Sequence, residues 1–531
     1  MVGTIQTEHR TAPGTQILVD QGGNPSSDRD YGCYQHIAQG ETRILLVPQP
    51  SVTDINDPLR WPRWKKHLAF GNALLYAFNG AMTGPMMAGG MLQLAAFFNR
   101  PLPDIAYSNG ATLISQGFGT LLWMPLAVKY GRRPVYLTSN ILMCIACIWL
   151  AIAAEKAYPV FVITRTFLGL WEAPIEAIVP STVTDLYHLH ERGEKISLYG
   201  LCVLGGNELG PLVSAYIIHG LSMRWAFFIV AMLIGGSVLG MALFMPETKF
   251  TGERPVIRRE MGGDEHDVGD EKGSSDHREA VEGDCSRGPP GCLHGSSPAK
   301  KNFLQELAFC SVVDREISIW RLFIRPFILM AYPTVLWVSS NTSLVHRPYN
   351  FPSGSQGLIF ISPLLGSLVG TYLCGPIADR VATYFTIRNG GIREPEMRLP
   401  TCIIAALLTF LGALISGVTY HYKTHWSGPI VGFGVLSAGA QMGATLSISY
   451  VLDCHTELSA EIMVTISCLK SAVAWVWTWC INDWVDANGL LVVFLAIGAV
   501  NVVVYASVFI FHIWGKAIRI WIHEKQFLGA S

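Results

Sequence analysis

Long apolar runs separated by shorter polar segments dominate the chain. Runs of roughly 20 apolar residues are long enough to cross a bilayer core about 30 Å thick, so they predict membrane-spanning helices. Six runs occur in the first half: His67–Gly90, Ile105–Val128, Pro134–Ala154, Tyr158–Val183, Ile196–Gly220 and Trp225–Met245. Six more occur in the second half: Ile319–Ser340, Gln356–Cys374, Leu399–Gly417, Pro429–Val451, Met463–Trp484 and Leu490–Ile513. The pattern predicts an all-α integral membrane protein with two six-helix bundles.

Polar segments divide this pattern into five parts. They are a cytosolic N-terminal tail (1–66), a first bundle (67–248), a central loop (249–318), a second bundle (319–513) and a cytosolic C-terminal tail (514–531). The central loop is rich in Gly, Asp, Glu, Arg and Ser, which cannot bury a core, so we expect it to be largely disordered. Its end, Asn302–Ser318, is compatible with a short amphipathic helix.

Two matching segments indicate that the chain is built twice. Val128–Pro134 follows the second apolar run of the first half, and Gly375–Arg380 follows the second apolar run of the second half. We expect both to be turns. A membrane protein with such a repeat is typical of a secondary transporter, whose substrate binds near mid-membrane between the two halves.

Basic residues gather in the loops on one side, as at Arg132, Arg192 and Arg388. The positive-inside rule places these loops and both termini in the cytosol. The single Asn-x-Ser/Thr sequon begins at Asn341, in a predicted outer loop where a glycan can be attached.

Composition excludes several classes of protein. The chain is 50% hydrophobic and 15% charged, whereas a soluble domain carries about 25% charged residues. Its net charge of -1 gives no reason to expect a nucleic-acid partner. The sequence lacks a GxxxxGK[ST] phosphate loop, clustered metal ligands and a nucleophile elbow. We therefore expect neither an enzyme nor an ATP-driven pump, and no cofactor or metal.

Several short motifs match one family when they are read in order. They are Asp57–Lys66, Pro125–Pro134, Arg165 with Gly169, Glu191–Gly193, Gly206–Pro211, Pro246–Thr248 and Pro395–Leu399. With them the chain resembles the major facilitator superfamily, specifically its fungal twelve-helix drug:proton antiporter-like group. The resemblance runs from Asp57 to Ile513 and implies the major facilitator fold.

The resemblance also implies roles for two motifs. The loop motif would supply gating residues, namely Lys129, Gly131, Arg132, Arg133, Asp379 and Arg380. The antiporter motif of the fifth helix would seal the interface between the halves through Gly206, Gly210 and Pro211. This chain departs from the family in one place, since Val128 stands where the loop motif usually has Asp. The second copy keeps Asp379, so we expect a weaker charge contact in the first half.

Charged side chains inside predicted spans are candidates for proton coupling, because an isolated charge in a bilayer is costly. Arg165, Glu172 and Glu176 share one face of the fourth helix, and Glu208 lies at a similar depth in the fifth. A carboxylate that loses its water binds a proton more readily. We expect Glu172 or Glu208 to carry the proton and Arg165 to bias its affinity. The alternative is a static hydrogen-bonded pair that locks helices together.

A substrate cavity at mid-membrane could use polar, aromatic and Met side chains. Candidates at suitable depths are Asn79, Gln116, Asn207, Tyr332, Trp337, Gln441 and Met442. Met-rich and aromatic surfaces adapt to bulky apolar ligands, although most such side chains in membrane helices pack or face lipid. Lys470 in the eleventh span is expected to reach the membrane surface, pair with a carboxylate such as Asp453, or contact an anionic substrate.

These features together predict proton-coupled export of a lipophilic drug or fungal secondary metabolite by alternating access. One alternative is proton-coupled uptake of a small organic nutrient, polyamine or organic ion. Another is a membrane sensor that binds a ligand without moving it. We expect a monomer in the plasma membrane, with the vacuole or another internal membrane as the alternative. Its partners would be the substrate, protons and membrane lipid.

Overall fold

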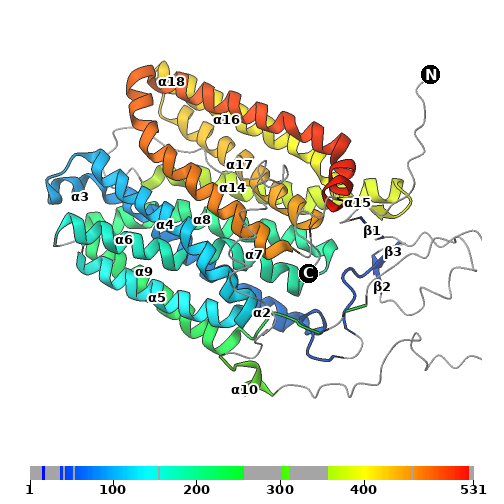
Figure 1. Cartoon of the computed structure of the whole chain (residues 1–531). Helices are drawn as coiled ribbons and strands as arrows, with labels where there is room; N and C mark the ends of the chain where they lie inside the picture. The colour runs from blue at the N-terminus through cyan, green and yellow to red at the C-terminus, as the bar shows by residue number, and fades with distance from the viewer. Residues whose placement is uncertain are drawn as a thin grey trace, which may run out of the picture.

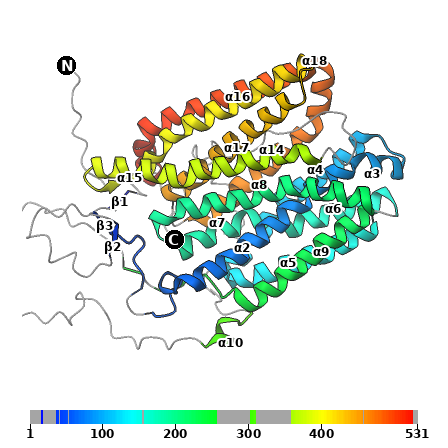
Figure 2. The same cartoon turned by 180° about the vertical axis from the view of Figure 1, so that it is seen from behind.

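The computed structural model describes residues 15–17, 36–39, 42–51, 54–153, 156–252, 254–255, 302–309, 357–455 and 458–524. Its long helices run side by side in an elongated bundle (Figures 1 and 2). Within the described ranges, nine helices are long and apolar enough to cross a membrane. The seventh predicted span, Ile319–Ser340, lies outside these ranges.

Each of the six spans predicted in the first half corresponds to helix. The elements are α2 (Arg63–Thr83), η2 (Pro85–Gly90), α3 (Met91–Phe98), α4 (Leu102–Tyr130), α5 (Arg132–Ala153), α6 (Tyr158–Glu172), α7 (Ile175–Leu186), α8 (Leu189–Gly220) and α9 (Met223–Phe244). The fourth span is divided into α6 and α7 at Ala173 and Pro174. Proline has no N–H to donate, which explains why the helix is interrupted there.

The described part of the second half contains helices for the other five spans. The elements are η3 (Gly357–Phe360), α14 (Ile361–Tyr372), the π-helical turn η4 (Leu373–Ile377), α15 (Ala378–Arg388), η5 (Pro395–Thr401), α16 (Cys402–His421), α17 (Ser427–Cys454) and α18 (Ser459–Glu524). The long α18 is interrupted at Gly489, where φ is +76°. Glycine adopts this left-handed conformation without strain, so Gly489 separates the eleventh and twelfth spans.

One predicted turn is wrong. Gly375–Arg380 is not a turn, because the eighth helix continues through η4, which contains Pro376, into α15. A π-turn lets a helix pass a residue that cannot donate its N–H. Helix α18 continues beyond the predicted twelfth span, to Glu524. Arg519 is buried in this extension and pairs with Glu396 through contacts of 2.8 and 2.9 Å.

Short strands gather at one end of the bundles, next to α15 (Figure 1). Strand β1 (Gln16–Ile17) pairs with β4 (Ile392–Arg393), and β2 (His36–Gln39) pairs with β3 (Thr42–Leu45). The turn η1 (Pro58–Arg60) precedes α2, and α10 (Phe303–Glu306) is the described part of the predicted amphipathic helix. We call this end the tail end.

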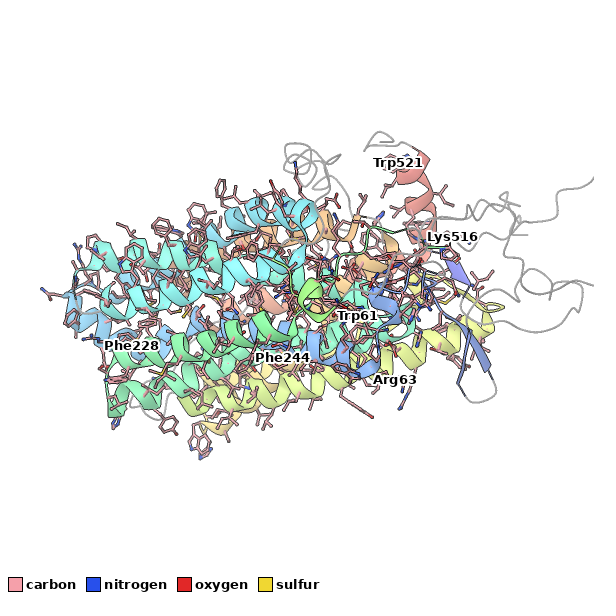
Figure 3. The ribbon with its side chains drawn as sticks, turned by 90° about the horizontal axis from the view of Figure 1, so that it is seen from below. Trp61, Arg63, Phe228, Phe244, Lys516 and Trp521 are labelled. Atoms are coloured by element: carbon pink, nitrogen blue, oxygen red, sulfur yellow. The ribbon has the colours of Figure 1, made fainter. Side chains whose placement is uncertain are left out.

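Apolar side chains cover the outside of the helices. Figure 3 shows Phe228 and Phe244 projecting from the helical surface, with Trp61, Arg63, Lys516 and Trp521 toward the tail end. Leu239 is 66% exposed and Met232 is 66% exposed on the same helix, α9. A contiguous apolar surface of this kind is typical of contact with lipid rather than water.

Candidate functional site

Glu208 connects the two bundles through hydrogen bonds. It lies on α8, and its carboxylate accepts from Ser367 of α14 at 3.0 and 3.3 Å and from Ser437 of α17 at 2.9 Å. The two serine hydroxyl oxygens are 2.7 Å apart. Glu208 is only 8% exposed, and the described residues form no ion pair with it. Hydroxyls can donate to an ionised carboxylate or accept from a protonated one, so this cluster can hold Glu208 in either state.

A second contact between the bundles joins two charged side chains. Lys470 of α18 donates to the carboxylate of Glu176 on α7. Pairing with a carboxylate is one of the three alternatives expected for Lys470, and its partner is Glu176 rather than Asp453, which pairs with Arg398 at 2.8 Å. The Glu176–Lys470 ion pair therefore links the fourth and eleventh helices across the interface.

Arg165 and Glu172 make their contacts inside the first bundle. The fully buried Arg165 donates to the side-chain oxygen of Asn109 at 2.7 Å and to the carbonyl of Gly84 at 3.3 and 3.4 Å. Glu172 accepts from the hydroxyl of Thr83 at 2.9 Å. These bonds tie α6 to α2, α4 and the turn after α2. Arg165 is therefore bonded to Asn109 and Gly84 rather than to Glu172.

The antiporter motif faces a different neighbour from the one that the resemblance implies. A Cβ atom at Gly206 would lie 2.6 Å from the carbonyl of Phe78, and one at Gly210 would lie 2.8 Å from the carbonyl of Met82. Both glycines therefore pack closely against α2 within the first bundle. Glu208 lies two residues from each of them, about 200° around the helix, and so faces the second bundle. Pro211 is buried inside α8.

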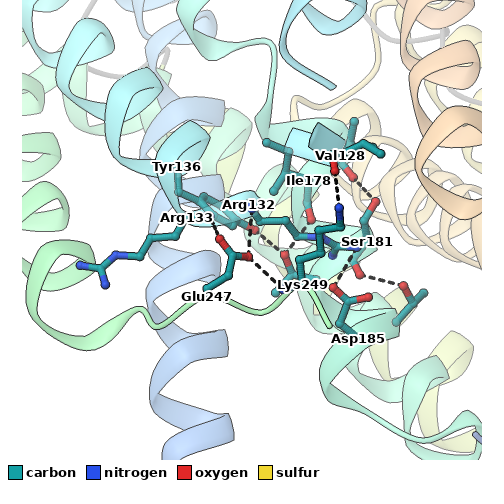
Figure 4. A network of polar contacts seen from close by, with 12 residues as sticks. Val128, Arg132, Arg133, Tyr136, Ile178, Ser181, Asp185, Glu247 and Lys249 are labelled. Carbon is teal, nitrogen blue, oxygen red and sulfur yellow. Dashed lines mark hydrogen bonds and ion pairs between the residues drawn. The ribbon is translucent and has the colours of Figure 1, made fainter. Parts of the chain in front are cut away.

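The first copy of the loop motif forms a polar network at the tail end (Figure 4). Arg132 forms an ion pair with Asp185 at 2.9 Å. The carboxylate of Glu247 accepts from the backbone N–H groups of Arg132 and Arg133 at 3.0 and 3.1 Å. Gly131 has φ of +97°, and a Cβ atom there would lie 2.3 Å from Glu247. These contacts hold the start of α5 against the end of α9. Lys129 is half-buried at the end of α4.

The second copy forms a buried charge network that extends to the other bundle. Arg398 pairs with Asp379 at 2.5 Å and with Asp453 at 2.8 Å. A Cβ atom at Gly193 of α8 would lie 2.5 Å from both carboxylate oxygens of Asp379. Asp379 therefore lies directly against the first bundle, whereas Arg380 is exposed on α15.

Two predicted cavity residues in α17 contribute to packing. Gln441 donates to the carbonyl of Ser197 at 3.3 Å and to the hydroxyl of Thr371 at 3.1 Å, so it bridges α8 and α14. Met442 is fully buried. Gln441 therefore lies at the interface between the bundles, where its side-chain amide holds them together.

The remaining cavity candidates have different positions. Asn79 donates to the carbonyl of Leu233 at 3.3 Å, which joins α2 to α9 inside the first bundle. Gln116 is buried in α4, and Asn207 is half-buried in α8. Three predicted residues lie outside the described ranges: Tyr332, Trp337 and the sequon residue Asn341.

Further interface contacts lie between α4 and α18. The rings of Tyr107 and Trp479 stack with centroids 4.1 Å apart. The thiol of Cys468 donates to the carbonyl of Gly117 at 3.1 Å. With Asp379 beside Gly193 at the tail end, the described helices bring the bundles into contact at both ends.

This architecture matches a known family. The model of the Major Facilitator Superfamily matches residues 69–474, about three quarters of the chain. The chain belongs to the Major Facilitator Superfamily. It is 24% identical to an uncharacterized MFS-type transporter of Schizosaccharomyces pombe, covering 97% of this chain and 94% of that one. It is 22% identical to Protein HOL1 of Saccharomyces cerevisiae (90% of each chain) and 27% identical to the MFS-type transporter penM of Penicillium rubens (80% of each).

Solved structures show the same fold. The partially occluded inward-open xylose transporter XylE from E. coli has a TM-score of 0.56 and 14% identity, covering 84% of this chain and 98% of that one. The human organic anion transporter MFSD10 has a TM-score of 0.54 and 14% identity, covering 84% and 100%. The chain therefore has the predicted all-α major facilitator fold. It is a multi-pass membrane transporter and not an enzyme.

Proposed function

We propose that this transporter exports a lipophilic organic compound, either a drug or a fungal secondary metabolite, in exchange for protons. The observation that carries the proposal is the hydrogen bonding of Glu208 to Ser367 and Ser437 of the other bundle. A protein named as a probable efflux pump, mfs2 of Aspergillus flavus, is 24% identical over 82% of this chain and 98% of its own length, which supports the direction.

The Glu208 cluster couples protonation to bundle movement for a simple reason. When α8 separates from α14 and α17, the carboxylate loses both serine hydroxyls and gains water. The two environments stabilise the charged and neutral carboxyl to different extents. A ligand shifts a conformational equilibrium only through such a difference in affinity, and here the ligand is the proton. Proton binding and alternating access are therefore linked at one side chain.

The other proton-coupling candidates have partners that favour other roles. Glu176 has a cation, Lys470, and the two charges stabilise each other across the interface. Glu172 is hydrogen-bonded to Thr83, and Arg165 is held by Asn109, all within the first bundle. We therefore assign the coupling proton to Glu208, an inter-bundle contact to Glu176, and a supporting role to Arg165 and Glu172.

An apolar substrate fits the aromatic side chains at the interface. Tyr107 and Trp479 present stacked rings there, and Trp475 is 37% exposed on the same helix as Trp479. Aromatic faces bind large apolar ligands with little loss of side-chain entropy. We propose that the protein works as a monomer in the plasma membrane.

The decisive experiment measures transport in proteoliposomes with an imposed pH gradient and a panel of labelled lipophilic compounds. We expect Glu208→Gln to lower gradient-driven transport about tenfold or more, because glutamine cannot release a proton. Exchange of labelled for unlabelled compound without a gradient should continue. Glu194→Gln is the matched control, since Glu194 is exposed on the same helix and pairs with its neighbour Lys195.

Three outcomes would change the proposal. Wild-type transport that is equal with and without a pH gradient removes the proton coupling. Accumulation instead of export of a compound reverses the direction and favours the uptake alternative. A normal gradient response of Glu208→Gln moves the proton to another carboxylate.

A further inference from the structure

A buried arginine at the tail end lacks a counter-charge of its own. Arg393 on β4 is 4% exposed, and its Nη2 atom is buried without a hydrogen bond to any described residue. Within the described ranges its one ion-pair contact is with Oδ1 of Asp379 at 3.8 Å, which is too long for a hydrogen bond. The same oxygen already accepts from Arg398 at 2.5 Å. A buried charge without a partner is costly, and native proteins rarely leave one uncompensated.

The charges around Arg393 do not balance. The described groups that act on it electrostatically are the guanidinium groups of Arg192 and Arg398 and the carboxylates of Asp379 and Asp453. With Arg393 itself, three positive charges stand against two negative ones. Arg398 binds both carboxylates, at 2.5 and 2.8 Å, and Arg192 donates to two backbone carbonyls of its own bundle. The described cluster therefore carries one surplus positive charge, which falls on Arg393.

Neighbouring carboxylates do not supply the missing charge, because they have cations of their own. Asp185 pairs with Arg132 at 2.9 Å, and Glu394, the residue after Arg393, pairs with Lys516 at 2.8 Å. Burial, followed by the nearby positive charge of an arginine, lowers the pKa of Arg393 to about 10. This is the direction expected for a guanidinium that is short of negative charge. Arg393 nevertheless remains charged at neutral pH.

His190 of the first bundle faces the same cluster. It lies on α8 three residues before Gly193 and so shares its helix face, and a Cβ atom at Gly193 would lie 2.5 Å from the carboxylate oxygens of Asp379. Arg393 and Asp379 are among the charges that act on the His190 ring. Nδ1 of His190 is buried and has no hydrogen bond within the described part of the chain. In the tautomer with a proton on Nδ1, this atom is a donor. Each bundle therefore contributes one unpartnered nitrogen to the tail end of the interface.

We propose that a small monovalent anion, chloride, binds between Arg393 and His190 when the bundles are closed at the tail end. The anion supplies the missing charge to Arg393 and accepts from Nδ1–H of His190. One negative charge matches the surplus, whereas a water molecule would satisfy the hydrogen bonds and leave the charge. Burying a divalent oxyanion costs more than burying a monovalent ion, so sulfate and phosphate groups are disfavoured.

The anion links the bundles because its two ligands belong to different ones. Separation of α8 from β4 breaks the site, so chloride binds the closed tail end more tightly than the open one. A ligand with such a preference shifts the equilibrium toward the state that it binds. Chloride therefore regulates how readily the tail end opens. This role goes beyond proton coupling at Glu208, because it does not depend on the substrate or on the driving ion.

Thermal unfolding in different salts tests the site directly. The purified full chain is unfolded in detergent in sodium chloride and, at the same concentration, in sodium gluconate, whose anion is too large for a buried site. We expect the wild type to unfold at a higher temperature in chloride and Arg393→Gln to lose this difference. In gluconate, Arg393→Gln should unfold no earlier than the wild type, because it removes an uncompensated buried charge. Arg388→Gln is the matched control, since Arg388 is exposed on α15 and lies over the ring of Tyr384.

The accessibility of the closed interface tests the effect on opening. Ser197→Cys introduces a thiol at a buried position of α8, beside Gly375 of the second bundle. Its reaction with maleimide, followed by mass spectrometry of that peptide, reports opening of the tail end. If chloride binds the closed state alone, labelling should slow about tenfold at a chloride concentration about ten times the Kd. Arg393→Gln should abolish this slowing, and His190→Ala should weaken chloride binding about tenfold, as expected for one lost hydrogen bond to an ion.

The same measurements can overturn the chloride site. Equal unfolding temperatures of the wild type in chloride and gluconate would show that no anion is bound, and a chloride effect that persists in Arg393→Gln would place the anion elsewhere. Stronger protection by sulfate, or by vesicles of anionic phospholipid, contradicts a small monovalent ligand. Stabilisation without slower labelling of Ser197→Cys shows that the anion does not hold the bundles. Neither readout needs a substrate or a pH gradient, so these failures are separate from failure of the Glu208 proposal.

Discussion

The two copies of the loop motif differ in how far their contacts extend. In the first copy, the contacts described here stay within the first bundle (Figure 4). Arg132 pairs with Asp185, and Lys249 donates to the backbone carbonyl of Val128 at 2.5 Å. Position 128 usually carries an Asp in the family. Here it is Val128, and its backbone carbonyl accepts from Lys249 in the loop after α9.

The second copy extends across the interface. Arg398 is 3% exposed in its side chain and holds Asp379 and Asp453 together. The carboxylate of Asp379 lies against Gly193 of the first bundle. Among the contacts described here, the second copy of the motif reaches the other bundle at the tail end and the first copy does not. The two sides of the interface should contribute unequally to closure.

Removal of the central cation should have the largest effect. Arg398→Gln leaves Asp379 and Asp453 without their main partner, which typically costs about 3–5 kcal/mol for a buried pair. We expect a much lower unfolding temperature in detergent and little folded protein. Arg398→Lys is the control, because it keeps the charge and one contact and should lose less. Equal unfolding temperatures for wild type and Arg398→Gln would contradict the importance of the network.

A methyl group at the contact point should have the next largest effect. Gly193→Ala places a Cβ atom 2.5 Å from the carboxylate oxygens of Asp379, which Arg398 prevents from withdrawing. Overpacking costs about 1–3 kcal/mol, so we expect transport to fall about tenfold or more. Gly235→Ala on α9 is the control, since a Cβ atom there meets nothing within 4 Å. Normal transport by Gly193→Ala would mean that the contact is loose.

Restoring the missing carboxylate should have a smaller effect. By analogy with Asp379 beside α8, an Asp at position 128 would lie near the start of α18, where a negative charge at a helix N-terminus adds about 0.3–1 kcal/mol. We expect Val128→Asp to slow opening of the tail end about two- to fivefold. The measurement is maleimide labelling of a Ser197→Cys thiol, since Ser197 is buried on α8 beside Gly375 of the second bundle. Val128→Asn tests whether the charge is responsible. Labelling that is the same in all three proteins would show that position 128 no longer faces the interface.

The smallest expected effect is a pH dependence of stability, which arises from Asp185 in the network of the first motif copy. Burial raises the pKa of Asp185 to about 6, although Arg132 opposes this shift. Because the folded protein binds this proton more tightly than the unfolded chain, the contribution of Asp185 to stability falls as pH rises from about 4 to about 6, and then stays constant. The difference in unfolding temperature between wild type and Asp185→Asn should follow that curve. A difference that is constant from pH 4 to 8 would refute it.

The sequence allowed the helices to be predicted because each apolar run is long enough to act alone. Breaks inside helices are harder to predict from the sequence, because Pro174 interrupts the fourth span whereas Pro376 is accommodated by a π-turn. Hydropathy does not distinguish these outcomes, which depend on what packs around each proline. The end of α18 was missed for a related reason: Arg519 looks like a residue of a polar tail until Glu396 is placed beside it.

The site was predicted in part. The depth of Glu208 followed from its position in the fifth span, but its partners Ser367 and Ser437 are 159 and 229 residues away and belong to a common residue type. The Lys470–Glu176 pair spans 294 residues. Contacts between the halves depend on how the two bundles face each other, which the order of residues within one half does not show.

The pair of serine hydroxyls beside Glu208 has one more consequence. Either oxygen can be the donor across their 2.7 Å separation. A proton added to the carboxyl can therefore turn one hydroxyl, so that Ser367 accepts from Glu208 and donates to Ser437, while every heavy atom stays in place. The first response to an arriving proton would be a rotation of dipoles, which an electron-density map does not record. Infrared spectra of the carboxyl and hydroxyl vibrations would detect it before either bundle has moved.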